Sequence, residues 1–191
     1  MLGLLPAEDR ATLRAVVLRQ PTRKQCVLSA IWGRLDYSFD FGPVHGPAVI
    51  LEAQPKGNVF QLPRSRSVED AEELERLRTD GHALSRGRRW RIQTTPASTR
   101  STQLFRTLPH EVGHLVHYRR EVEQRAGSDE FPDPLVAFFS RPQREREDFA
   151  HRYAREAVER LSAEGHVPFP RIVDEASMRR WGVDPRWFGL A

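Results

Sequence analysis

Cysteine and lysine are nearly absent from this chain of 191 residues. Cys26 is the only cysteine, which excludes a disulfide within the chain, and its simplest role is that of a small buried apolar residue. Lys24 and Lys56 are the only lysines among 30 basic residues, so arginine carries almost all of the positive charge.

Long hydrophobic runs are missing as well. The apolar start, Met1 to Leu5, has no basic leader and is soon followed by Glu8 and Asp9. Such a start is neither a signal peptide nor a membrane span, so we expect a cytoplasmic protein with no membrane partner. The length and the apolar fraction of 39% suit one globular domain with a proper core.

The net charge of +4 comes from scattered arginines, with local runs at residues 86–91 and 141–146. A basic surface can contact nucleic acid or an acidic protein. Because no nucleic-acid-binding motif is present, we favour the simpler interpretation of a solvated surface, and nucleic acid is the less favoured partner.

The stretch Leu108–Tyr118 contains the pattern His-Glu-x-x-His. Histidines four apart on a helix lie one above the other, so His110 and His114 can bind one small cation. Neutral imidazole is a good zinc ligand, which makes Zn2+ the expected cofactor. Glu111 points to the same side without being needed as a ligand and is placed to act as a general base.

Helical periodicity supports this interpretation. At about 100° per residue, the apolar side chains of this region fall on one side of the helix and the titratable ones on the other. The apolar set is Leu104, Phe105, Leu108, Val112, Leu115 and Val116, and the opposite set is His110, Glu111, His114, His117 and Tyr118. A surface helix with two stray histidines would have no reason for this separation.

A catalytic zinc normally has three protein ligands and one open position. The strongest candidate for the third ligand is Glu147, at the start of a second helix whose apolar stripe is Ala150, Tyr153, Ala154, Ala157, Val158 and Leu161. Asp148, Glu145 and His151 remain alternatives. His117 lies about 10 Å along the axis from His110, so we expect it beside the ligands or in the pocket wall rather than on the ion.

The pair HEVGH and EDFAHRYA resembles the gluzincin clan of zinc metallopeptidases, including small members such as the anthrax lethal factor catalytic domain. The resemblance covers roughly residues 99–161. It implies three zinc ligands and a general base: His110, His114, Glu147 and Glu111. Two positions differ from the pattern, because His151 stands where such proteins often carry a second Glu that supports a ligand, and Ser140 stands roughly where several place a Tyr.

Peptide hydrolysis also needs a donor for the developing oxyanion and a place for the substrate backbone. Tyr118, His151 and Tyr153 are the candidate donors. An edge strand near the metal is expected to bind the substrate, and the candidates are residues 89–95 first and residues 48–53 second.

The remaining elements follow from periodicity and turn signals. Apolar residues on one side predict a helix over Pro6–Gln20, and strand formers predict strands over residues 26–32, 35–41, 47–52 and 88–95. A capping box at Ser67 predicts a helix that Gly81 can end. We expect a partly ordered loop over residues 126–143 and a tail anchored by Trp181, Trp187 and Phe188.

Two residues near the motif carry further expectations. Pro109 predicts either a helix that begins near Thr107 or a longer one that is kinked there. Gly113 lowers the helix propensity of this segment relative to alanine, and we expect that its lack of a side chain lets another backbone pass close by.

The sequence therefore predicts a single α+β, zincin-like domain. In it, a small twisted, mostly antiparallel sheet packs on an active-site helix and a second, ligand-bearing helix. Residues 1–98 hold the sheet and upstream helices, residues 99–163 the metal-binding core, and residues 164–191 a tail packed on the domain. The expected function is zinc-dependent endopeptidase activity on a protein or peptide, and the alternative is a zinc-stabilised binding or regulatory module that contacts nucleic acid or an acidic protein.

Overall fold

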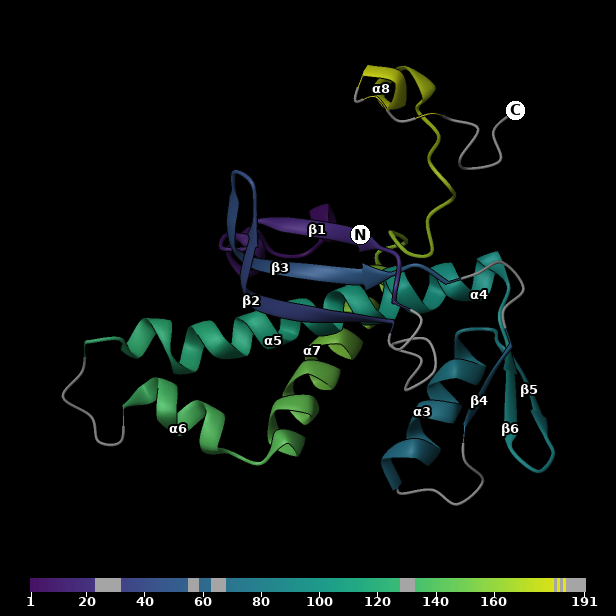
Figure 1. The fold of residues 1–191 in the computed structure, drawn as a ribbon, viewed down its shortest axis with the longest axis horizontal. Coiled ribbons are helices and arrows are strands. Elements are labelled where there is room, and N and C mark those ends of the chain that lie inside the picture. Colours follow the sequence, from purple (N-terminus) through teal and green to yellow (C-terminus); the bar gives the residue numbers. More distant parts are fainter. Residues whose placement is uncertain are drawn as a thin grey trace.

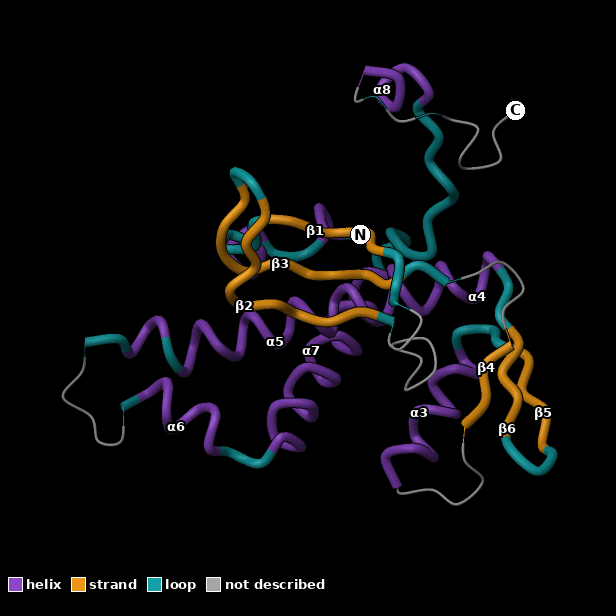
Figure 2. The backbone as a smooth tube through the Cα atoms, in the orientation of Figure 1, coloured by secondary structure: helices purple, strands orange, loops and turns teal. Residues whose placement is uncertain are grey.

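A computed structural model describes residues 1–22, 32–54, 59–62, 68–127, 133–180, 182 and 184 (Figure 1). The elements are η1 (Leu2–Leu4), α1 (Ala7–Arg10), β1 (Ala15–Arg19), β2 (Gly33–Phe41), β3 (Val44–Glu52), β4 (Val59–Leu62), α3 (Val68–Thr79), β5 (Ala83–Arg86), β6 (Trp90–Gln93), α4 (Pro96–Arg100), η2 (Ser101–Thr107), α5 (Leu108–Glu121), η3 (Glu123–Arg125), α6 (Pro134–Ser140), α7 (Gln143–Ala163) and α8 (Glu175–Arg180). The α+β class predicted from the sequence is confirmed. The described strands form two small sheets rather than the single sheet we expected (Figure 2).

The first sheet has the strand order β1-β3-β2, with β1 parallel and β2 antiparallel to the central β3. The last five residues of β3, from Ala48 to Glu52, are all buried. The Glu52 carboxylate contacts Arg19 of β1 at 2.6 Å and Arg34 of β2 at 2.5 Å, so one buried charge ties the three strands together. The strands predicted over residues 35–41 and 47–52 are confirmed, whereas the one over 26–32 lies, except for Trp32, outside the described residues.

The helix predicted over Pro6–Gln20 is wrong beyond its first turn. Only Ala7–Arg10 is helical, and Ala15–Arg19 forms β1, whose residues alternate between partly buried and exposed positions. Consecutive Val16, Val17 and Leu18 suit a strand, and pairing with β3 decides between the two structures. A long-range contact has overridden a local helical pattern.

The second sheet, β4-β6-β5, is antiparallel and is covered by α3. Its core consists of Trp32, Leu74, Leu77 and Ile92. Both the helix predicted after Ser67 and the strand predicted over residues 88–95 are confirmed, as α3 and the shorter β6.

Helix α5 lies against the first sheet through Leu108, which packs on Val49 and Leu51 of β3. On another side, α5 crosses α7 (Figure 1). The two helices approach closely at Gly113, where an added Cβ would lie only 3.0 Å from the Ala150 Cα. The close passage predicted for Gly113 is confirmed.

Pro109 lies one residue after the start of α5, in a helical segment that runs without a break through α4, η2 and α5. The residues immediately before it, Ser101–Thr107, form a π-helix, and the Leu108 N–H bonds to the Gln103 carbonyl, five residues back. In a regular α-helix the proline ring would clash with the carbonyl four residues back. The wider π turn relieves this clash, so α5 can begin at the His-Glu-x-x-His motif.

Residues 134–140 form helix α6, where we expected part of a loop. Asp133 caps this helix by accepting hydrogen bonds from the N–H groups of Leu135 and Val136, and Pro134 occupies its first turn. The local capping chemistry therefore favours a short helix despite the nearby prolines.

The tail packs on the domain through Val167, which is buried, and Phe169, whose ring meets Phe105 edge-on. Helix α8 buries none of its residues and stands away from the two sheets (Figure 1). The predicted anchors Trp181, Trp187 and Phe188 lie outside the described residues. No helix in the described ranges combines the length and apolar character needed to cross a bilayer.

Candidate metal centre

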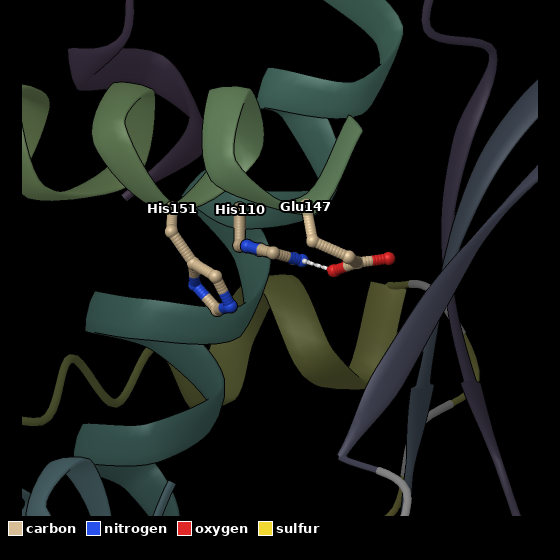
Figure 3. A group of neighbouring side chains, drawn as sticks. All are labelled: His110, Glu147 and His151. Atoms are coloured by element: carbon tan, nitrogen blue, oxygen red, sulfur yellow. Dashed lines mark ion pairs between the residues drawn. The ribbon is translucent and has the colours of Figure 1, made fainter. Parts of the chain in front are cut away.

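Three predicted ligands meet where α5 crosses the first turns of α7. The Nε2 atoms of His110 and His114 lie 3.1 Å apart. The Glu147 Oε2 lies 3.3 Å from the first and 3.6 Å from the second. Figure 3 shows His110 and Glu147 pointing toward each other from their two helices.

These spacings fit a zinc ion. A tetrahedral site with bonds of 2.0–2.1 Å separates its ligand atoms by about 3.3 Å. The three measured separations, 3.1, 3.3 and 3.6 Å, scatter around that value. Hydrogen bonds from His110 and His114 lower the pKa of Glu147, so its carboxylate is ionised and able to act as a ligand.

His151 lies one helical turn after Glu147 and beside His110, with the two imidazole centroids 4.3 Å apart (Figure 3). The donor atoms of His110, Glu147 and His151 all lie within 4.8 Å of one another, a looser group than the one with His114. Burial, reinforced by the charges of His110 and Arg76, lowers the pKa of His151 to about 3, so the ring is neutral. A neutral imidazole can bind a metal, so His151 is a further donor beside the three predicted ligands.

Glu111 is buried, with 7% of its surface exposed. Its Oε2 accepts a hydrogen bond of 2.8 Å from the Leu35 N–H of β2. Strand β2 can come this close because it carries Gly33, where a Cβ would lie 2.8 Å from the Thr107 Cγ2. Burial raises the pKa of Glu111 above its ordinary value.

A cavity of about 530 Å³ joins these groups. It is bounded by β2, α5, the end of α6 and the start of α7, and its lining includes all three ligands, Glu111 and His151. The structure thus brings together the predicted base and the predicted metal-binding residues.

Three other predicted site residues do not line this cavity. His117 is buried in an aromatic layer, stacked on Phe149 at 4.2 Å, so it is not part of the pocket wall. Tyr118 lies behind Tyr37, with its ring centroid 4.7 Å away. The Tyr153 hydroxyl donates to the Asp9 carboxylate at 2.7 Å, which holds it away from the ligands. This geometry supports none of them as an oxyanion donor.

Tyr37 was missed by the sequence analysis. It lies on β2 two residues after Leu35, lines the cavity, and contacts Phe139 at a ring distance of 5.9 Å. Burial is the main cause that raises the pKa of Tyr37 to about 12, so its hydroxyl keeps its proton and can donate. The strand alternation that predicted β2 was the available signal, but it does not tell which face of the strand lines the cavity.

Both predicted edge strands are wrong. Residues 90–93 form the central strand of the second sheet, and residues 48–52 belong to the central strand of the first. Their main-chain groups are engaged on both sides. Among the described strands, the edge strand that borders the cavity is β2, and it contributes Gly33, Arg34, Leu35 and Tyr37 to the lining.

Comparisons with protein-family models, with curated proteins and with solved structures find no match to this chain. The function is therefore inferred from the sequence motifs and the geometry of the site.

Proposed function

We propose that this protein is a zinc-dependent endopeptidase of the gluzincin type with a zincin-like fold. One observation carries the proposal: two histidines and a glutamate from two crossing helices place their donor atoms at zinc spacing, with Glu111 in the same cavity. A structural zinc site usually has four protein ligands. The fourth would have to be His151, whose group with His110 and Glu147 is looser, or His117, which is stacked on Phe149 outside the cavity, so three ligands and an open position are favoured.

In this proposal His110, His114 and Glu147 hold the metal. A bound zinc ion supplies a Lewis acid for a peptide carbonyl and makes water a better nucleophile. Glu111, oriented by the Leu35 N–H, takes the proton from the attacking water on its other oxygen and passes it to the leaving amine. A raised pKa suits a group that must hold this proton briefly.

Tyr37 and β2 supply the remaining parts. The Tyr37 hydroxyl donates a hydrogen bond to the oxygen on which negative charge develops. The outer edge of β2 pairs with no other described strand, so an extended substrate can pair with its main-chain groups beside the cavity, other than the Leu35 N–H that is bonded to Glu111. The substrate is a protein or peptide, as predicted, but the strand that binds it is β2.

The first test is the metal content of purified protein. We expect about one zinc per chain in the wild type and in Glu111→Gln, and much less in His110→Ala and Glu147→Ala. Glu145→Ala is the matched control, because Glu145 lies on the same turn of α7 but is exposed. Wild-type protein that takes up no zinc would exclude the proposal.

The second test is cleavage of a mixed peptide library, followed by mass spectrometry. Loss of the base should reduce the rate in Glu111→Gln by about 10²- to 10⁴-fold while zinc is retained. Unchanged biological activity in Glu111→Gln, with zinc bound, would instead favour the zinc-stabilised binding module.

A further inference from the structure

Three arginines line the metal-site cavity, and two of them are paired with carboxylates, although Arg34 shares its carboxylate with Arg19. Arg34 pairs with Glu52 at 2.5 Å. Arg106 pairs with Glu73 at 2.9 Å and with Asp80 at 2.6 Å. Within the described ranges, the third arginine, Arg146, forms no ion pair with a carboxylate.

Arg146 is nevertheless held firmly. Its Nη1 donates to the carbonyl oxygens of Phe138, Phe139 and Arg141 at 3.3, 3.3 and 3.4 Å. The guanidinium also lies near the faces of the Phe138 and Phe139 rings, 5.8 and 5.6 Å from their centroids. These neighbours fix the group but carry no full negative charge, and they use only part of its fork of N–H donors.

The carboxylates that line the cavity already have partners other than Arg146. Glu73 is paired with Arg106, and Glu147 faces the two histidines. Glu111 is buried and bonded to the Leu35 N–H. The positive charge of Arg146 is therefore left for a ligand, at a position that adjoins Glu147 in the chain and shares the cavity wall with Tyr37.

We propose that Arg146 is a specificity-determining residue that binds a carboxylate of the substrate close to the bond to be cleaved. The carboxylate belongs either to an Asp or Glu side chain, which suits cleavage within a chain, or to the end of a peptide chain, in which case the same site would remove C-terminal residues instead. Guanidinium and carboxylate match in shape, and their charge-assisted hydrogen bonds are stronger than neutral ones. This inference names the substrate class for the endopeptidase activity proposed above and rests on that activity.

The test measures binding in the Glu111→Gln background, where the peptide is not consumed. Four pools of short fluorescent peptides are compared: a central Glu or a central Gln, each with a free or an amidated C-terminus. We expect at least about tenfold tighter binding when the carboxylate is present. The amidated pair reports recognition of a side chain, and the Gln-containing pair reports recognition of a chain end.

Arg146→Gln should remove the preference, and Arg146→Lys should keep part of it because the charge remains. Arg144→Gln is the matched control, since Arg144 lies on the same helix but is 71% exposed and pairs with Asp148 at 3.8 Å. Thermal melting checks that each variant is folded. If Arg146→Gln is not folded, the comparison of wild type with Arg146→Lys is used instead.

Equal or absent binding of all four pools, or a preference that survives in Arg146→Gln, would overturn the inference. Failure of the proposed activity has a different signature, namely no bound zinc or no cleavage by the wild type. A carboxylate preference that disappears with Arg146 would support the recognition role in either case, because the binding assay needs no catalysis.

Discussion

At the scale of single residues, two tyrosines near helices α5 and α7 have different surroundings. The Tyr37 ring lines the cavity, whereas the Tyr153 hydroxyl is bonded to Asp9 at 2.7 Å. We expect Tyr37→Phe to lower kcat by about 10²-fold with little change in KM, because the lost bond forms mainly in the transition state. Steady-state cleavage of a fluorogenic peptide measures both constants.

Tyr153→Phe is the matched control for Tyr37→Phe. It should leave kcat unchanged and lower the free energy of unfolding by about 1 kcal/mol, through loss of the hydrogen bond to Asp9. If the two variants lose catalysis equally, Tyr37 is not the oxyanion donor.

His82 gives the stability of the metal-free protein a dependence on pH. It is buried, and its Nε2 lies 2.8 Å from the Thr102 hydroxyl, which in turn donates to Asp80. Burial lowers the pKa of His82 in the folded protein, and Asp80 only partly offsets this. The folded state therefore binds fewer protons than the unfolded state once the pH falls below about 6.5.

The free energy of unfolding should consequently be highest above about pH 6.5 and fall as the pH decreases, by up to about 1.4 kcal/mol per pH unit from His82. Urea unfolding of wild type and His82→Gln at several pH values isolates this contribution, because other histidines are common to both. Parallel pH profiles for the two proteins would show that His82 does not contribute.

At the scale of elements, the crossing of α5 and α7 depends on Gly113. Alanine is the better helix former by about 1 kcal/mol. However, its Cβ would lie 3.0 Å from the Ala150 Cα and 3.2 Å from the Ala150 carbonyl oxygen. These are backbone atoms of α7, so they can move away only if the two helices separate. We expect Gly113→Ala to lower the free energy of unfolding by about 1–2 kcal/mol and to weaken zinc binding.

The proposed zinc binding should be affected because the two helices carry different proposed ligands, so any separation moves His110 and His114 away from Glu147. Competition with a chelator measures the affinity. Gly3→Ala serves as the control, since a Cβ there meets nothing within 4 Å. A Gly113→Ala protein that binds zinc as tightly as the wild type would contradict this account of the crossing.

The same two helices explain how much of the site could be predicted from the sequence. Both α5 and α7 carry long apolar stripes with a helical period. The local pattern alone therefore predicted on which face of its helix His110 and Glu147 each lie. The edge position of β2 depends on which strands pair, as in the register of Ala15 with Ala48, and no local pattern encodes such a contact. For that reason Tyr37, which β2 carries to the cavity, was not identified.

Helix α6 was missed for a different reason. The prolines around it suggested a loop, although Asp133 followed by Pro134 is a favourable start for a helix. Here the signal was present in the sequence and was outweighed by composition.

At the scale of the whole molecule, Arg106 joins α3, which covers the second sheet, to the helical segment that leads into α5. From η2 it reaches Glu73 on α3 and Asp80 just after it. We expect Arg106→Gln to speed hydrogen exchange of the α3 amides by at least about tenfold, because local opening becomes easier, while α5 and α7 are less affected. Mass spectrometry of deuterium uptake measures this.

Arg78→Gln is the control for Arg106→Gln. Arg78 pairs with Glu75 on the exposed side of α3, and exposed pairs of this kind contribute little to stability. Equal exchange rates in wild type and Arg106→Gln would show that α3 is held by its apolar contacts alone.

The parallel pairing of β1 with β3 also sets an order of assembly during synthesis. Ala15 pairs with Ala48, so β1 leaves the ribosome well before β3 and stays unpaired until β3 has been synthesised. Val16 and Leu18, which remain exposed in the finished sheet, are apolar during that wait. The growing chain is thus most open to association with other chains before residue 52 is complete. The proposed zinc ligands, which lie between residues 110 and 147, emerge only after the first sheet that supports them.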